Sequence, residues 1–314
     1  MLEITFLGTG SGVPTPRRNH SAIYLRYEDQ NFLWDCGEGT QKQIMKSGLN
    51  FMKIDKIFIT HWHADHWAGL IGLIQTMNLE KRQKALEIYG PEAEKFVGDI
   101  LDMDYWGPRF EIVPINVQFQ KPEISVLVKE KAFTITSIPM KHSIPSVAFC
   151  FQEEGSWNVD VEKSEKLYGL KQGPMIGKLK EKGEIEFKGK KIKLGDVAVL
   201  NQGLKAAYSG DTRPNQNMIK LAEGADLLIH ESTFGEEIDD TLDRAHTRVA
   251  DAAETAKKAG VKQLILTHFS RRYQDVSPLL KIAKDIFPKT EAAEDFMKVE
   301  LKREGIEIKK KWKT

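Results

Sequence analysis

The sequence predicts a layered α/β protein, and three observations support this fold class. Short apolar runs typical of strands alternate with stretches typical of helices along the 314 residues. Polar residues follow several of the apolar runs directly, as they do where α/β folds place their sites. The hydrophobic fraction is 41%, so one large core remains possible even though the chain is longer than a usual single domain.

Composition excludes some classes of protein. The formal net charge is +1, so any nucleic-acid binding must come from a local basic patch. The two cysteines, Cys36 and Cys150, lie in apolar runs and are expected to be buried thiols rather than ligands or a disulfide. The first residues already read as a strand, and no apolar run approaches the roughly 18 residues of a membrane span. We therefore expect a cytoplasmic protein without a membrane segment.

The N-terminal region is predicted to contain strands at 3–8, 22–27 and 32–36. The glycine-rich run 8–12 follows the first strand, and it either cradles a phosphate or forms a plain turn. Asp35 lies at the end of the third strand. It either hydrogen-bonds to a ligand histidine and orients it, without touching the metal, or only caps the strand.

The densest chemistry lies at 61–66, His-Trp-His-Ala-Asp-His, between an apolar run and a predicted helix. Imidazole and carboxylate groups suit Zn²⁺ and similar divalent ions. Four such groups in six residues cannot all reach one point, so two ions are predicted. His61 and His63 would bind one ion, and Asp65 and His66 the other. The alternative is a chance run of surface histidines.

Further polar residues follow later apolar runs. His142 follows the run 132–138 and is placed to complete a three-histidine set, although a lone histidine is more often structural. Asp211 could bridge two ions, and His268 could complete the second set. Glu231 ends another predicted strand. A helix is expected over 249–259, with Gly260 as its end.

Residues 153–195 differ in character, because apolar residues are sparse and lysines accumulate in the second half. A hairpin turn is expected at 188–190. The segment is interpreted as a protruding arm that contacts a phosphate backbone, with an ordinary solvated insertion as the alternative. Its lysines are Lys178, Lys180, Lys182, Lys188, Lys190, Lys191 and Lys193. The basic tail at 309–313 is expected to fray.

These motifs together resemble the metallo-β-lactamase superfamily, whose signature His-x-His-x-Asp-His is matched at 61–66. Within it the chain resembles the short form of tRNase Z, the endonuclease family that trims the 3′ ends of tRNA precursors. The matching elements are 6–10, 35–41, 61–66, His142, 209–212, 230–234 and His268. The family's Pro-x-Lys-x-Arg-Asn loop appears at 14–19 with Pro16 in place of lysine, and its His-Ser-Thr element appears as His246-Thr247-Arg248.

The resemblance implies an αββα sandwich formed by 1–314 as a single domain, with 153–195 as an inserted flexible arm that serves as the tRNA exosite. It implies a homodimer with two Zn²⁺ per chain, acting on precursor tRNA. The products would be a tRNA with a 3′-hydroxyl and a trailer with a 5′-phosphate. In the implied ligand sets, His61, His63 and His142 hold one ion, Asp65, His66 and His268 hold the other, and Asp211 bridges them.

The resemblance also implies catalytic roles. Asp65 would be the general base, and His246, oriented by Glu231, would protonate the leaving 3′ oxygen. Two other functions are compatible with these motifs. One is a hydrolase of a small thioester, lactone or cyclic phosphodiester, which would need the same metals but no arm. The other is a non-catalytic RNA-binding scaffold, which would not need a complete ligand set.

Overall fold

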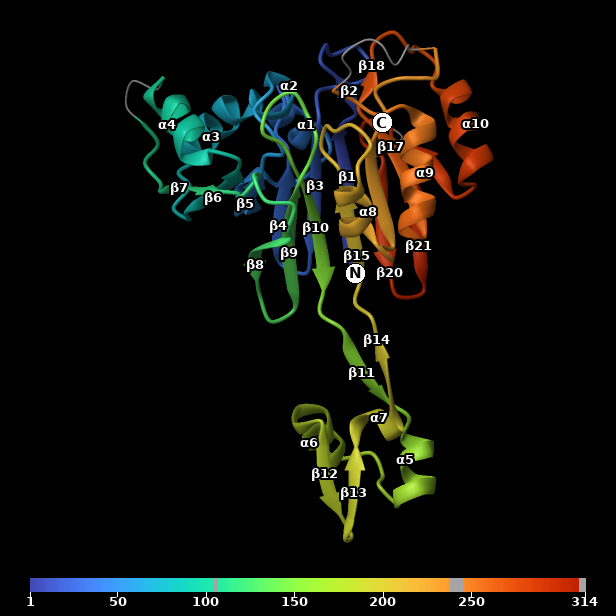
Figure 1. Ribbon diagram of the computed structural model, residues 1–314. Coiled ribbons are helices and arrows are strands. Elements are labelled where there is room, and N and C mark those ends of the chain that lie inside the picture. The colour runs from blue at the N-terminus through green and yellow to red at the C-terminus, as the bar shows by residue number, and fades with distance from the viewer. Residues whose placement is uncertain (104–106, 238–244, 311–314) are drawn as a thin grey trace. The chain divides into compact units, whose positions relative to one another are not determined.

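The computed structural model describes residues 1–103, 107–237 and 245–310 and divides into two compact units (Figure 1). The core unit comprises Met1–Lys129, Thr134–Phe151 and Leu204–Thr314. The arm unit comprises Glu130–Phe133 and Gln152–Gly203, and it contains the whole segment predicted as an arm. Residues 311–313 of the predicted frayed tail lie outside the described residues.

One sheet of the core unit has eight strands in the order β21-β20-β1-β3-β4-β5-β6-β7. The pairs from β4 to β7 are parallel, and the pairs from β21 to β4 are antiparallel. The strands are β1 (Leu2–Gly8), β3 (Ala22–Tyr27), β4 (Gln30–Trp34), β5 (Lys56–Phe58), β6 (Leu86–Gly90), β7 (Ile112–Asn116), β20 (Lys298–Lys302) and β21 (Gly305–Lys309). The expected N-terminal strands are confirmed, although β4 ends at Trp34 rather than at 36.

Helices α1 (Thr40–Lys46), α3 (Gly69–Leu79) and α4 (Ala93–Asp102) pack against this sheet. Their apolar faces bury residues such as Leu73 and Val97 in one cluster with Ile57 of β5. This arrangement is what an apolar stripe at helical spacing requires. The helix predicted directly after the motif at 61–66 is α3, which begins at Gly69, because the preceding residues form the separate short helix α2 (Ala64–Trp67).

The second sheet has seven strands in the order β19-β17-β16-β15-β10-β9-β8. These are β8 (Ser125–Lys129), β9 (Phe133–Pro139), β10 (Val147–Glu153), β15 (Lys205–Tyr208), β16 (Leu227–Glu231), β17 (Gln263–Thr267) and β19 (Thr290–Ala292). Its helices are α8 (Gln216–Ala222), α9 (Val249–Ala259) and α10 (Ser277–Ile286). The prediction for α9 is confirmed to the residue, and Gly260 ends it with a φ of 64°.

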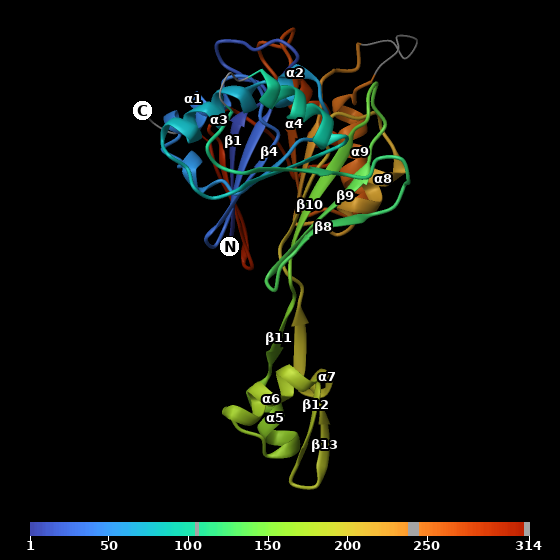
Figure 2. The same ribbon diagram turned by 90° about the vertical axis from the view of Figure 1, so that its left-hand side faces the viewer.

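Large aromatic side chains fill the space between the two sheets. Phe58 of β5 lies 5.4 Å from Phe149 of β10 between ring centroids, and Trp34 of β4 stacks on Tyr208 of β15 at 5.8 Å. Helices cover the outer face of each sheet (Figure 2). The core unit is therefore the predicted αββα sandwich. Both cysteines are buried free thiols, as expected.

The arm unit has a small hydrophobic core of its own, formed by Leu170, Ile176, Leu179 and Ile192 with their neighbours. Its elements are β11 (Ser156–Val159), α5 (Val161–Tyr168), α6 (Pro174–Lys182), β12 (Glu184–Phe187), β13 (Lys190–Lys193), α7 (Leu194–Val197) and β14 (Ala198–Asn201). Strands β12 and β13 form the hairpin predicted at 188–190. Among the described helices of either unit, none is long and apolar enough to cross a membrane.

Candidate metal centre

Three histidines from two strand ends meet at one point. His61 and His63 follow β5, and His142 follows β9. The distance from His63 Nδ1 to His61 Nε2 is 3.1 Å, and to His142 Nε2 it is 3.0 Å. This cluster is the first ligand set predicted from the sequence, and its nitrogen atoms all lie within 4.8 Å of one another.

A second cluster joins Asp65 and His66 of α2 with Asp211 after β15 and His268 after β17. His268 Nε2 lies 3.2 Å from His66 Nε2 and 3.3 Å from Asp65 Oδ2. All four ligand atoms again lie within 4.8 Å of one another. Residues about 200 positions apart in the chain are thus brought together where segments that follow β5 of one sheet and β15 and β17 of the other sheet meet.

Asp211 lies between the two clusters. Its Oδ2 is 3.6 Å from His61 Nε2 and 3.4 Å from His66 Nε2. The preceding Gly210 makes this approach possible, because a Cβ there would lie 2.7 Å from Thr60 and its φ is +55°. The geometry is that of a carboxylate able to bridge two ions.

The donor set fits cations, because several lone pairs point at one another. His66 Nδ1 lies 2.7 Å from Asp35 Oδ2, and His142 Nδ1 lies 2.8 Å from the Ala245 carbonyl. Since those oxygens accept, each Nδ1 carries the proton and each Nε2 presents its lone pair to the cluster. The buried Asp211 Oδ1 accepts no hydrogen bond from any described residue. A divalent ion would satisfy all these groups at once.

Side chains that hydrogen-bond to the candidate ligands, without belonging to either cluster, fix the orientation of those ligands. Asp35 accepts hydrogen bonds from Thr60 N (2.8 Å) and from Tyr208 Oη (2.7 Å) while it contacts His66. Of the two interpretations of Asp35, the structure therefore supports the one in which it orients a histidine, here His66 of the second cluster. Asp35 and His268 both have positive φ, 56° and 60°. Such strain in a residue other than glycine is typical of functional sites.

His246 and Glu231 lie beside the second cluster. His246 Nδ1 is 3.1 Å from Glu231 Oε1 and 3.6 Å from Asp211 Oδ2. Glu231 is fully buried and accepts further hydrogen bonds from the backbone N–H groups of Thr212 and Thr233. Burial lowers the pKa of His246, but Glu231 outweighs it and raises this pKa to about 9. The imidazole is thereby held as a proton donor at neutral pH.

The electrostatics of the two clusters differ. Burial lowers the pKa values of His61, His63 and His142, so these imidazoles stay neutral, which is the form that binds metals. Burial also opposes the charging of His66, but the surrounding carboxylates, with Asp211 first, raise its pKa well above the usual value. This negative field favours positive charge at His66 Nε2, and a bound cation would supply that charge in place of a proton.

Sequence reasoning missed several supporting residues. Thr60 Oγ1 lies 3.0 Å from His61 Nδ1, and Thr233 Oγ1 lies 2.8 Å from His268 Nδ1. Gly12 N donates to Asp65 Oδ2 at 2.8 Å. The threonines could have been noticed because each stands beside a polar strand end. Nothing local marks Gly12, since its partner is 53 positions away.

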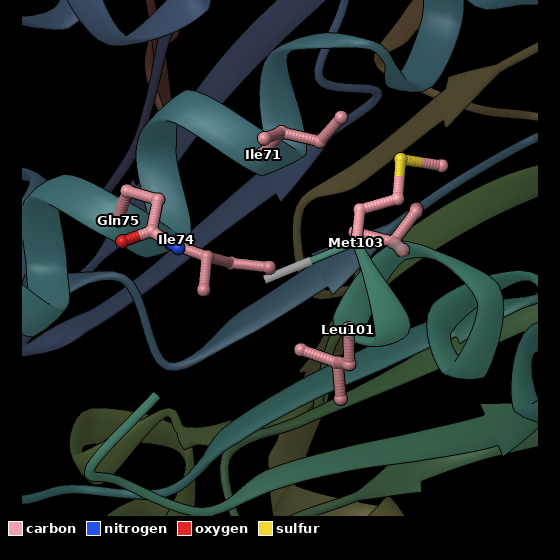
Figure 3. Close-up of a pocket in the computed structure, with 6 residues that line it drawn as sticks. Ile71, Ile74, Gln75, Leu101 and Met103 are labelled. Carbon is pink, nitrogen blue, oxygen red and sulfur yellow. The ribbon is translucent and has the colours of Figure 1, made fainter. Parts of the chain in front are cut away.

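A separate cavity of about 100 Å³ lies between α3 and α4 (Figure 3). It is lined by Ile71, Ile74, Gln75, Ile100, Leu101 and Met103. Apart from the Gln75 amide this lining is apolar, so it offers no group for hydrolytic chemistry.

The sandwich and its histidine and aspartate clusters define the class as the metallo-β-lactamase superfamily. A family model described as "Beta-lactamase superfamily domain" matches residues 186–269, and one described as "Anti-Pycsar protein Apyc1" matches residues 2–102. Ribonuclease Z of Methanothermobacter thermautotrophicus is 43% identical, covering 96% of this chain and 97% of that protein. Ribonuclease Z of Archaeoglobus fulgidus is 38% identical, covering 96% and 98%. The chain belongs to the ribonuclease Z family, which confirms the resemblance found in the sequence.

Solved structures agree with this assignment. The short form of human tRNase Z superposes with a TM-score of 0.68 at 30% identity, covering 95% of this chain and 98% of that one. The metallo-β-lactamase fold protein YhfI of Bacillus subtilis has the same TM-score at 21% identity, covering 95% and 98%. The YhfI likeness supports the fold alone.

Proposed function

We propose that this protein is a zinc-dependent endoribonuclease that cleaves the 3′ trailer from precursor tRNA. After cleavage the tRNA would end in a 3′-hydroxyl, and the trailer would begin with a 5′-phosphate. The observation that carries the proposal is the convergence of seven candidate metal ligands beside the Glu231–His246 pair, in a chain of the ribonuclease Z family.

The two clusters are proposed to hold two Zn²⁺ per chain. His61, His63 and His142 would hold one ion, and Asp65, His66 and His268 the other, with Asp211 shared between them. Bound ions of this kind neutralise phosphate charge and lower the pKa of water. The chain's own contribution is a rigid, mostly buried set of donor atoms. Contacts of Asp35, Thr60 and Thr233 with the Nδ1 atoms of the histidines fix which ring nitrogen carries the proton.

Two side chains are proposed to move protons. Asp65 would accept the proton of the attacking water, since its carboxylate is ionised: burial raises its pKa, but His66 and His268 lower it far below the usual value. His246 would donate its proton to the leaving 3′ oxygen of the tRNA. Glu231 would keep His246 protonated and oriented through the 3.1 Å contact.

The arm unit is proposed to bind the body of the tRNA. All seven lysines counted at 178–193 are exposed. They extend from helix α6 to strand β13, on a chain whose net charge is only +1. Phosphate contacts of this kind supply affinity rather than cleavage chemistry. A homodimer and a cytoplasmic location are further proposals, which follow from membership of the family.

One experiment tests the activity directly. A precursor tRNA labelled at its 5′ end is incubated with the zinc-loaded protein, and the products are resolved by length and end chemistry. The proposal expects one cut at the trailer junction, with a 3′-hydroxyl on the labelled fragment. Intact precursor, together with rapid hydrolysis of a small thioester, lactone or cyclic phosphodiester, would instead favour the small-molecule hydrolase.

A further inference from the structure

A carboxylate outside the ligand sets joins three segments of the core unit. Asp295 follows β19, and its side chain is partly buried. Its Oδ1 accepts a hydrogen bond from Thr9 Oγ1 at 2.8 Å. Its Oδ2 accepts from the backbone N–H of Asn19 at 2.7 Å and from Gln43 Nε2 at 3.1 Å. Burial raises the pKa of Asp295 to about 6, so at neutral pH the ionised carboxylate is kept at a cost in stability.

Arg18 makes a second set of hydrogen bonds beside Asp295, and these also hold the segment that contains Thr9. Its Nη1 donates to Thr9 Oγ1 at 2.7 Å and to the Ala293 carbonyl at 2.8 Å. The guanidinium also lies 4.6 Å from the ring centroid of Phe269. Arg18 is therefore turned toward the protein, whereas the adjacent Arg17 is exposed. Thr9 serves both attachments, because its hydroxyl donates to Asp295 and accepts from Arg18.

The segment that these residues hold, the 9–19 loop, reaches the metal centre at its other end. Strand β2 (Gly10–Ser11) of the loop pairs with β18 (Phe269–Ser270), which directly follows the candidate ligand His268. Beyond β2, the backbone N–H of Gly12 donates to Asp65 Oδ2 at 2.8 Å. That oxygen is the one that lies 3.3 Å from His268 Nε2. One continuous set of contacts thus runs from Asp295 through the loop to Asp65.

We propose that Asp295 is a positioning residue which, with Thr9 and Arg18, fixes the 9–19 loop so that the Gly12 N–H holds the Asp65 carboxylate in its working orientation. This inference rests on the proposed function of Asp65. A carboxylate that must both face a metal and accept a proton needs one defined orientation, and displacements of about 1 Å can cost about 100-fold in rate. Without its attachments the loop would sample other conformations, and Asp65 would lose its hydrogen-bond donor.

The test compares Asp295→Ala with Asp295→Asn and with Glu294→Ala. The side chain of Glu294 is exposed, so Glu294→Ala controls for the loss of a neighbouring carboxylate. Hydrogen exchange by mass spectrometry is measured first, on metal-free and zinc-loaded protein. Asp295→Ala is expected to speed exchange of amides at 9–20 and to leave those of β6 unchanged. Asp295→Asn retains an oxygen that can accept from Asn19, and it should preserve most of the protection, as should Glu294→Ala.

Kinetics then separate positioning from substrate contact. For Asp295→Ala, kcat should fall about 10- to 100-fold on both precursor tRNA and a small activated phosphodiester, with little change in KM. Asp295→Asn should restore most of the rate. If Asp295→Ala fails to fold, Thr9→Val removes the shared hydroxyl and should give the same pattern.

Unchanged exchange at 9–20 would overturn the inference, as would faster exchange with normal kcat on both substrates. A rise in KM for precursor tRNA alone would also overturn it, because the loop would then contact the substrate. If the wild-type protein does not cleave precursor tRNA, the proposed function fails. The exchange data and the small phosphodiester still decide the role of Asp295 in that case.

Discussion

The core unit and the arm unit use their charged residues in opposite ways. In the core unit, histidines and carboxylates are buried at strand ends and turned toward one another, with separations of 3.0 to 3.6 Å. In the arm unit, the lysines of α6 and of the β12–β13 hairpin are exposed, and few of them form ion pairs among the described residues, as Lys191 does with Glu184. Buried and converging charge changes pKa values and binds ions, whereas exposed charge supplies affinity that salt screens. This difference is the basis for the proposal that the core unit supplies the chemistry and the arm unit the affinity for tRNA.

Removing the metal should have the largest effect, and it should act on the chemistry of the core unit. Dialysis against a chelator should abolish cleavage of both precursor tRNA and a small activated phosphodiester, because both depend on the two clusters. Elemental analysis of the active protein should find two zinc ions per chain. Zinc added back should restore both activities together. One zinc or none in active, unchelated protein would defeat the two-ion proposal.

Asp65→Asn keeps the size of the side chain but removes the basic oxygen and one negative charge. Turnover should fall by about 10²- to 10⁴-fold, the usual contribution of a general base, with the circular dichroism spectrum unchanged. The exposed Asp29→Asn is the matched control and should be active. Near-normal cleavage by the Asp65 variant would remove its assigned role.

His246→Ala should discriminate between substrates by their leaving groups. Cleavage of tRNA expels a poor leaving group that needs a proton, so its rate should fall by about 10²- to 10³-fold. Hydrolysis of a nitrophenyl phosphodiester should change much less, because that leaving group departs without protonation. Glu231→Gln should show the same pattern as His246→Ala, with a larger loss on tRNA than on the nitrophenyl phosphodiester. Equal losses on both substrates would mean that His246 serves the metal centre instead.

The arm unit can be shortened at a paired position of its own sheet. Ser156 of β11 lies opposite Asn201 of β14, so residues 157–200 can be replaced by a short Gly/Ser turn. This variant should bind zinc and hydrolyse the small phosphodiester normally. Its KM for precursor tRNA should rise about 10- to 1,000-fold, and its binding should depend less steeply on salt because phosphate contacts are lost. An unchanged KM would show that the segment is only a solvated insertion.

The smallest expected effect concerns stability and pH. Because burial raises the pKa of Asp295 to about 6, the folded state binds this proton more tightly than the unfolded chain does. The contribution of Asp295 to the free energy of unfolding should therefore fall as pH rises from about 4 to 6, by roughly 1 to 3 kcal/mol. Asp295→Asn should remove that dependence and be more stable than wild type at pH 7. Urea unfolding at several pH values measures the difference, and parallel curves for the two proteins would contradict it.

The sequence by itself determined the elements and indicated the candidate ligands. Alternating apolar runs specify strands through local periodicity, and glycine after 259 ends a helix for a local reason. The dense motif at 61–66 places four donors within one turn, where the chemistry of the side chains identifies a metal site. The hairpin at 188–190 is equally local, since Gly189 supplies the turn.

Only the tertiary structure decided which groups meet. Asp35 contacts His66 across 31 positions, and His268 reaches His66 across 202. The hydrogen bond from Gly12 to Asp65 and the attachments at Asp295 link positions 53 and 276 apart. Such contacts depend on strand order and register in the folded chain, which no local pattern encodes. A threonine or glycine at such a position has many possible roles in a sequence, and its partner in space selects one.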